Sequence, residues 1–199
     1  MIIVDCIQNS PEWCAEKLGK PSASNASKII TSKGEPSKQR EGYLYELAAE
    51  RITGKREEGY TNGNILNGHD REDESRKLYE MLHGVEVRQV GVVYKDERMR
   101  FLCSPDGLVG SDYGLELKNV LPKTQVKYLL DGGLPSDYFG QVQMSLYVTG
   151  FKFWDFMTYS PGIKPLYVRV ERDEKYIKAL SVALEEFCDE LDKVTEKLR

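Results

Sequence analysis

Three side chains near the middle of the chain have the types and spacing that phosphodiester cleavage requires. Asp106 follows Ser104 and Pro105, and Glu116 and Lys118 come ten and twelve residues after Asp106. Two carboxylates can hold a divalent cation such as Mg²⁺, and a lysine can orient the attacking water. We therefore take Asp106, Glu116 and Lys118 as the candidate catalytic group.

A β-hairpin can bring these three side chains together. Residues 101–109 and 114–120 are rich in strand formers, and the Gly-Ser-Asp triplet between them has the composition of a turn. With this triplet as a three-residue loop, Asp106 faces Glu116. Directly opposed Cβ atoms lie about 5 Å apart, which suits two ligands of one cation.

The alternative interpretation is a solvent-facing hairpin with ordinary surface charges. Because strand side chains alternate, Glu116 and Lys118 share one face while Leu117 points into a core. The surrounding sequence is apolar at Phe101, Leu102, Leu108, Val109, Leu115 and Val120. Charges in such a segment need a partner, which favours a metal site over an exposed hairpin.

Length and composition indicate one soluble globular domain that spans residues 1–199. The apolar fraction is 40% and the charged fraction is 30%, as in ordinary globular proteins. No segment has the length of a membrane span, and the N-terminus lacks the basic and apolar regions of a signal peptide. We expect a cytoplasmic protein.

Cysteine and histidine usage argues against two other classes of protein. The four cysteines are scattered without a C-x-x-C pair, and there are only two histidines. A disulfide scaffold and a zinc centre are therefore not expected.

The charge distribution is uneven along the chain. The net charge is −4, which argues mildly against a nucleic-acid partner. Six basic residues and one acid lie between Lys17 and Arg40, whereas the C-terminal segment is acidic. A basic patch on an acidic body can still follow a phosphate backbone, although a solvated lysine-rich loop is the alternative.

The apolar periodicity and the Gly and Pro positions predict a mixture of helices and strands. Helices are expected at 11–18, 22–30, 37–52, 65–82, 122–130, 137–148 and 173–198, and strands at 85–94, 99–109, 115–120, 151–159 and 166–171. This order suggests an α/β sandwich with a central mixed β-sheet flanked by helices and with the acids on its middle strands.

With the strands placed, the acids and the lysine match the PD-(D/E)xK nuclease pattern, and the wider sequence resembles the phage lambda exonuclease family. The similarity is dense from about residue 68 to the C-terminus. Its blocks keep the family order at 94–97, 99–100, 103–108, 114–118, 141–143 and 171–176.

The resemblance implies a three-layer PD-(D/E)xK core and a specific activity. Members of the family digest one strand of linear duplex DNA from the 5′ end to mononucleotides, and this leaves 3′ single-stranded overhangs for recombination. They use Mg²⁺, with Mn²⁺ as a substitute. They form ring-shaped homotrimers and work beside a single-strand annealing protein. A phage or prophage origin in a bacterial host is implied as well.

The resemblance also assigns roles at the candidate site. Asp106 and Glu116 correspond to metal ligands, joined by the backbone carbonyl of Leu117. Lys118 corresponds to the residue that orients or deprotonates the water, and orientation is the safer role because a base would need a depressed pKa. Glu72 matches a helix glutamate that borders the second metal position.

Further family positions surround this group. Gln141 matches a glutamine that hydrogen-bonds near the water or the phosphate. Ser104 and Asp96 match positions near the site, with Asp96 expected behind the metal ligands rather than on the metal. On the residues alone, Gln141 is a surface helix residue and Asp96 a turn acid.

The residue expected to bind the 5′-phosphate differs from the one that the family uses. The family places an arginine four residues after a tryptophan, whereas here Lys17 follows Trp13. Lysine binds phosphate as a point charge without the bidentate fork of arginine, and Lys20 or Ser24 could share the contact. Trp13 itself is expected to be a core anchor.

Other functions stay open on the sequence alone. One is a different PD-(D/E)xK nuclease of the repair or CRISPR-associated kind, and another is a catalytically silent DNA-binding subunit. A polar loop at 55–64 and the two apolar residues after it are candidates to split the duplex.

Overall fold

The computed structural model describes residues 1–56 and 66–199, with side chains described up to 56 and from 71 onward. Most of the polar loop expected at 55–64 therefore lies outside the described residues. So do residue 65 and the side chain of residue 66, which were candidates to split the duplex. No helix in the described part of the chain is long and apolar enough to cross a membrane.

Helices form close to the positions that the sequence predicts. The helical segments are α1 Pro11–Lys17, the 3₁₀ turn η1 Ala23–Asn25, α2 Ala26–Ile29, α3 Arg40–Thr53, α4 Leu66–His83, α5 Pro122–Asp131, α6 Ser136–Thr149 and α7 Glu174–Leu198. Ser10 caps α1 by accepting a hydrogen bond from the Trp13 N–H, with Pro11 in the first turn. Gly54 ends α3 in the left-handed conformation.

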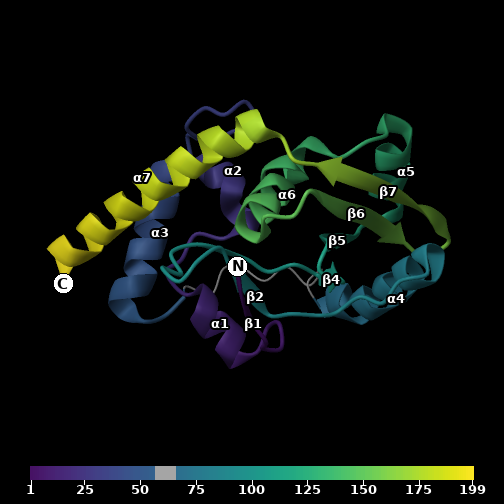
Figure 1. Cartoon of the computed structure of the whole chain (residues 1–199), viewed down its shortest axis with the longest axis horizontal. Helices are drawn as coiled ribbons and strands as arrows, with labels where there is room; N and C mark the ends of the chain where they lie inside the picture. The colour runs from purple at the N-terminus through teal and green to yellow at the C-terminus, as the bar shows by residue number, and fades with distance from the viewer. Residues whose placement is uncertain (57–65) are drawn as a thin grey trace.

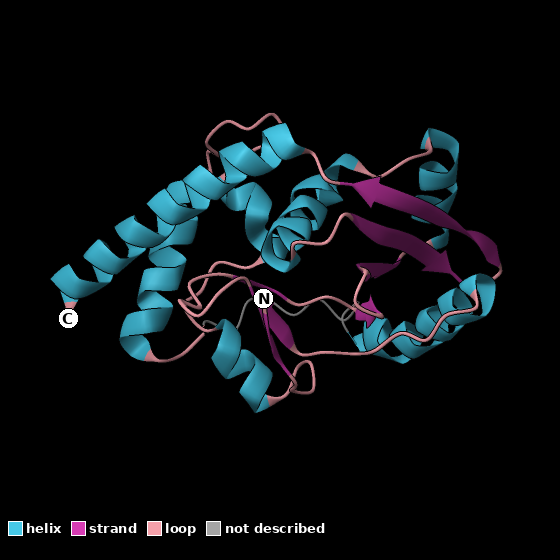
Figure 2. Ribbon diagram, in the orientation of Figure 1, coloured by secondary structure: helices cyan, strands magenta, loops and turns pink. Residues whose placement is uncertain are grey.

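The strands fall into two sheets (Figures 1 and 2). The first is antiparallel and contains β1 Ile2–Val4, β2 Val92–Tyr94 and β3 Leu102–Cys103. The second is mixed and contains β4 Gly107–Val109, β5 Tyr113–Asn119, β6 Phe153–Ser160 and β7 Ile163–Glu171. In the second sheet only β5 and β6 run parallel. The expected α/β class, with a mixed sheet flanked by helices, is confirmed.

Two predicted strands are wrong in their extent, and β1 was not predicted. The run at 99–109 breaks between β3 and β4, where Pro105 has no N–H to donate and its carbonyl accepts from the side chain of Gln8. The chain changes sheets at this break. Of the run at 85–94, only β2 is a strand, although Arg88 forms an isolated bridge with Leu108.

The second sheet has a core on each face. Trp154 and Phe156 of β6 pack in one apolar cluster with Val142 of α6, whereas Met157 packs in another with Tyr79 of α4. Because side chains alternate along a strand, α6 covers one face and α4 the other. Figure 1 shows these two helices on opposite sides of the sheet.

Close packing at the start of β5 requires glycine. Gly114 pairs with Trp154 across the sheet, and a Cβ on Gly114 would lie 2.2 Å from the buried indole ring. The small residue therefore lets the tryptophan lie flat over the strand that carries Glu116.

Helix α7 closes the other end of the molecule alongside α3 (Figure 1). The apolar residues on one side of this helix are buried from Ile177 to Leu191. Arg100 holds the acidic side of the helix through ion pairs of 2.7–2.9 Å to Glu185, Asp189 and Asp192. The four cysteines are free thiols in this structure.

Candidate active site

The hairpin between β4 and β5 has the predicted register. Leu108 pairs with Gly114 and Val109 with Tyr113. One residue before β4, the N–H of Asp106 donates to the Leu115 carbonyl at 3.1 Å. This register places Asp106 opposite Glu116.

A backbone amide orients Asp106. The N–H of Leu117 donates to Asp106 Oδ2 at 2.6 Å. The N–H and C=O of one strand residue point to the same edge of the strand, so the Leu117 carbonyl also faces the side of Asp106. The side chain of Leu117 is buried on the opposite face of the sheet, in the cluster with Tyr79.

Three polar side chains converge on the α6 face of β5. Glu116 is only 2% exposed. Its Oε1 lies 2.5 Å from Lys118 Nζ and accepts a hydrogen bond of 2.5 Å from Gln141 Nε2 of α6. The structure thus brings together Asp106, Glu116, Lys118 and Gln141.

The electrostatics of this group reflect two acids beside one base. Burial raises the pKa of Asp106 well above its usual range, and the charges of Glu116 and Glu72 raise it further. Burial alone would lower the pKa of Lys118, but the Glu116 and Asp106 carboxylates outweigh it and the net shift is upward. Lys118 therefore stays protonated beside the acids, which fits a residue that orients water better than a general base.

The donor set fits a hard divalent cation. Two carboxylates and one ammonium leave a formal charge of −1, and the Leu117 carbonyl adds a neutral oxygen. Within the described residues, no group of three or more His, Cys, Asp or Glu side chains is arranged to hold a metal. Mg²⁺ needs no such cage, because it usually keeps several waters and binds through one or two carboxylates.

A hollow of 170 Å³ opens in front of these side chains. Among its lining residues are the predicted Lys17, Ser24 and Ser104. The lining also includes Asp106, Glu116, Lys118 and Gln141, which we call the carboxylate cluster. Ser104 Oγ donates to the Gly91 carbonyl at 2.6 Å and accepts from the Trp13 indole at 2.9 Å. The hydroxyl is therefore fixed at the wall of the hollow.

Lys17 lies at the same wall with a perturbed charge. Its ammonium sits 3.9 Å from the centre of the Trp13 ring. Burial, followed by the nearby charge of Arg56, lowers the pKa of Lys17 to about 8. Lys20 is directed elsewhere, because its ammonium donates to the Tyr94 hydroxyl at 2.6 Å. Trp13 packs partly buried against the first sheet, as an anchor should.

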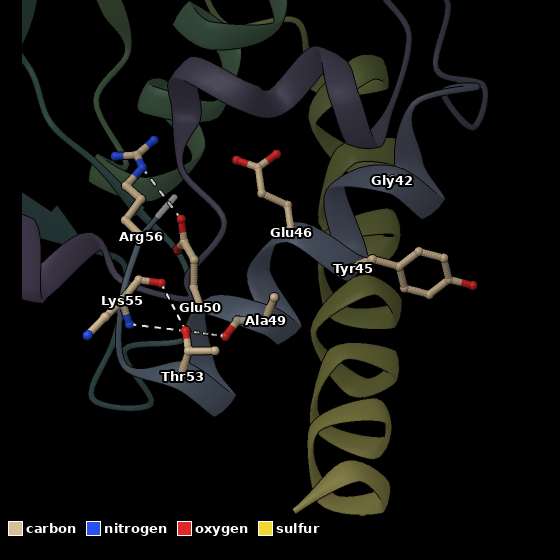
Figure 3. Close-up of a pocket in the computed structure, with 8 residues that line it drawn as sticks. All are labelled: Gly42, Tyr45, Glu46, Ala49, Glu50, Thr53, Lys55 and Arg56. Carbon is tan, nitrogen blue, oxygen red and sulfur yellow. Dashed lines mark hydrogen bonds and ion pairs between the residues drawn. The ribbon is translucent and has the colours of Figure 1, made fainter. Parts of the chain in front are cut away.

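A larger hollow of 700 Å³ lies beside α3 (Figure 3). The buried Glu50 accepts a 2.7 Å hydrogen bond from the Gly19 N–H and forms a 3.5 Å ion pair with Arg56. Figure 3 shows Arg56 and Lys55 beside Glu50. The Arg56 charge contributes to the lowered pKa of Lys17, so the charged residues of this hollow act on the wall of the smaller one.

Two predicted residues lie outside the small hollow. Glu72 sits on α4 with its Oε1 3.5 Å from Arg76, and its charge acts on Asp106, so it borders the site. Asp96 instead accepts from Arg98, which also pairs with Glu185 of α7. Because these contacts hold Asp96 in a turn beside α7, the structure gives it no contact with the carboxylate cluster.

Gln8, Asn9 and Tyr138 are among the residues at the site that the sequence did not single out. Gln8 and Asn9 line the hollow, and Gln8 ties the Pro105 and Val90 carbonyls together at 2.8 and 3.0 Å. The ring of Tyr138 lies 5.3 Å from the Lys118 ammonium. The spacing of Tyr138 and Gln141, one helical turn apart, was the available signal for Tyr138.

Comparisons with known proteins agree with this geometry. Residues 12–152 match the model of the YqaJ-like viral recombinase domain. The alkaline exonuclease LHK-Exo of Laribacter hongkongensis is 29% identical, with a TM-score of 0.86 over 95% of this chain and 96% of that one. The same enzyme has been solved in complex with dAMP.

Two further proteins are more distant or match a shorter segment. A phage-related exonuclease of Haemophilus somnus is 15% identical, with a TM-score of 0.65 over 90% of this chain and 96% of that chain, and shows the fold alone. ExoD of Escherichia coli K12, an uncharacterized protein, is 33% identical over 78 residues, which are 37% of this chain and 90% of ExoD.

Proposed function

The chain belongs to the YqaJ-like viral recombinase domain family, and from this premise we propose that it is a Mg²⁺-dependent 5′-to-3′ exonuclease acting on linear double-stranded DNA. The family and the fold, which is that of an alkaline exonuclease, support a DNA exonuclease role. The resemblance to the phage lambda exonuclease family and the PD-(D/E)xK core are confirmed. The observation that carries the proposal is the convergence of Asp106, Glu116 and Lys118 on one hairpin.

The oxygen donors of the hairpin hold the metal in this proposal. Asp106, Glu116 and the Leu117 carbonyl are the ligands, and Mn²⁺ can replace Mg²⁺. When bound, the metal polarises the scissile phosphate and lowers the pKa of an attacking water. Glu72 borders a second metal position from α4.

The remaining side chains of the cluster position the reactants. Lys118 donates hydrogen bonds to the attacking water and aims it at the phosphorus. Gln141 holds Glu116 Oε1 in place and donates toward the water or the phosphate. Both side chains are fixed before substrate binds, which lowers the cost of ordering the transition state.

The wall with Lys17, Ser24 and Ser104 binds the 5′-phosphate. A protonated Lys17 supplies a point charge, and the Ser24 hydroxyl supplies a directional hydrogen bond. Ser104, whose proton is already donated to the Gly91 carbonyl, shapes the wall beside the phosphate. The indole under the ammonium keeps Lys17 directed along the wall. This arrangement replaces the arginine fork that the family uses.

Wider properties of the proposal rest on the family. Residues 1–199 act as one nuclease domain, and three copies form a ring around the duplex. The enzyme releases mononucleotides and leaves 3′ overhangs for a single-strand annealing protein, in the cytoplasm of a bacterial host of phage or prophage.

Digestion of matched linear and circular duplexes tests the proposal. With Mg²⁺, the protein should consume only the linear form, release 5′-mononucleotides and stop when EDTA is added. The Lys118→Ala variant should fold and take up Mn²⁺ by calorimetry but lose cleavage. Opening of the circle would indicate an endonuclease, and no loss of either form would indicate a silent DNA-binding subunit.

A further inference from the structure

A buried carboxylate lies on the back of the sheet, opposite the candidate active site. Asp155 of β6 is 0% exposed. It accepts hydrogen bonds from the hydroxyls of Tyr79 at 2.6 Å and Tyr167 at 3.0 Å, and a bidentate pair from Arg169 at 2.8 and 2.9 Å. The proposed chemistry uses none of these groups.

The partners of Asp155 come from different elements. Tyr167 and Arg169 belong to β7, the neighbouring strand, and their bonds join two strands that already pair. Tyr79 belongs to α4, so its hydroxyl ties a helix to the sheet. The imidazole ring of His83, also on α4, lies 4.5 Å from the Tyr79 ring and 4.4 Å from the Tyr167 ring.

A second hydroxyl ties the same helix to the same strand. Tyr159 of β6 donates to Glu74 of α4 at 2.5 Å. The two bonds hold α4 at positions five residues apart, with opposite directions of donation. Apolar contacts alone would leave the helix some freedom to slide or rotate, whereas two directional bonds fix both.

The helix that these bonds fix carries Glu72. Glu72 and Tyr79 are seven residues apart, about two turns, so they lie on the same side of α4. Glu74, two residues after Glu72, bonds to Tyr159, which pairs with Asn119 next to Lys118 on β5, so this turn of α4 lies near the Lys118 end of that strand. The charge of Glu72 acts on Asp106, and Glu72 is otherwise held by Arg76 at 3.5 Å, a loose ion pair. Its place at the edge of the site therefore depends on how α4 is seated.

We infer that Tyr79, Asp155 and Tyr159 are positioning residues, which seat α4 on the back of the sheet and thereby set Glu72 at the edge of the carboxylate cluster. The inference rests on the proposed nuclease function and on the role of Glu72 in it. The inference goes beyond that function in one respect: side chains on the face of the sheet that DNA does not touch influence the kcat of cleavage.

A double-mutant cycle tests this coupling. Tyr79→Phe removes one hydroxyl and keeps the ring, and it should lower kcat about tenfold with little change in the KM for DNA. Tyr167→Phe is the matched control, because it removes a hydroxyl from the same Asp155 oxygen but one that belongs to β7, and it keeps the ring that lies against His83 of α4. It should lower Tm by a similar few degrees but change kcat less than twofold.

The decisive comparison uses Glu72→Gln as background. If Tyr79 acts through Glu72, Tyr79→Phe should cost less than twofold further in kcat once Glu72 is neutral. Hydrogen exchange of the amides at 71–83 gives a readout without activity, and it should rise in Tyr79→Phe but not in Tyr167→Phe.

The outcomes separate this inference from the function on which it rests. Failure of the wild type to digest linear duplex would refute the nuclease itself. With an active wild type, an equal Tyr79→Phe effect in both backgrounds, or equal effects of both tyrosine variants on kcat, would overturn only the coupling. Should Tyr79→Phe not fold, Tyr159→Phe takes its place in the cycle with the same expected loss.

Discussion

Replacing Asp106 with asparagine should stabilise the metal-free protein while abolishing its activity. In the absence of metal, Asp106 and Glu116 are two half-buried or buried acids that share a single lysine. Asparagine keeps the shape of the side chain and still accepts from the Leu117 N–H. It removes one of the two like charges.

The size of the effect follows from the hairpin geometry. Opposed side chains on paired strands lie about 5 Å apart. At an effective dielectric constant of about 20, two unit charges at that distance repel by about 3 kcal/mol. The attraction between Asp106 and Lys118 offsets part of this repulsion. We therefore expect a net gain of about 1–2 kcal/mol, or roughly 2–8 °C in Tm for a chain of this length.

The gain should depend on pH in a defined direction. Burial and the charge of Glu116 raise the pKa of Asp106 in the folded protein, so the folded state binds this proton more tightly than the unfolded chain. The stability of the wild type therefore falls as pH rises from about 4, the ordinary value for aspartate, to the raised pKa, and stays lower above it. The advantage of Asp106→Asn is full at high pH and vanishes below about pH 4.

Differential scanning calorimetry at pH 8 and pH 4, with and without Mg²⁺, measures these effects. Mg²⁺ should raise the Tm of the wild type and leave that of Asp106→Asn unchanged. Asp112→Asn, exposed at the tip of the same hairpin, is the matched control and should change Tm little. A lower Tm of metal-free Asp106→Asn at pH 8 would show that the two acids do not share one buried site.

Three further outcomes follow from the geometry. Lys17→Ala should slow digestion mainly of 5′-phosphorylated ends, and an equal loss on hydroxyl ends would refute the phosphate contact. The wild-type KM for phosphorylated ends should rise from pH 7 to pH 9, because Lys17 loses its proton near its pKa of about 8. The KM of Lys17→Arg should not change over this pH range. Gly114→Ala should lower the free energy of unfolding by about 1–3 kcal/mol in urea titration, since its Cβ would meet the Trp154 ring. Arg100→Leu should lower the free energy of unfolding by about 1–2 kcal/mol, because α7 loses its ion pairs to Arg100. High salt should reduce the difference in stability between this variant and the wild type.

The hairpin that carries the site could be predicted because local signals agreed. The turn triplet and the alternation around Glu116 favour one register, and a slip of one residue would split the site between the two faces of the sheet. Lys118 follows from the same alternation. The central chemistry is therefore encoded within about fifteen consecutive residues.

The features that local patterns could not predict depend on contacts between distant segments. The break between β3 and β4 is fixed by Gln8, about a hundred residues earlier, which bonds to the Pro105 carbonyl. Asp96 matches the family pattern, but Arg98 and the acidic side of α7 hold it in a turn.

The sheet itself explains why one polar group was found and the other was missed. Glu116 and Asp155 sit on neighbouring strands, one register position apart, and point to opposite faces. Glu116 has its partners close in sequence, so spacing reveals it. Asp155 draws its partners from α4 and β7, which lie 76 and 14 residues away, and a lone acid in an apolar strand gives only the signal that some partner must exist. Since the same two strands connect both groups, the back of the sheet can set the geometry of the front without contributing an atom to the reaction.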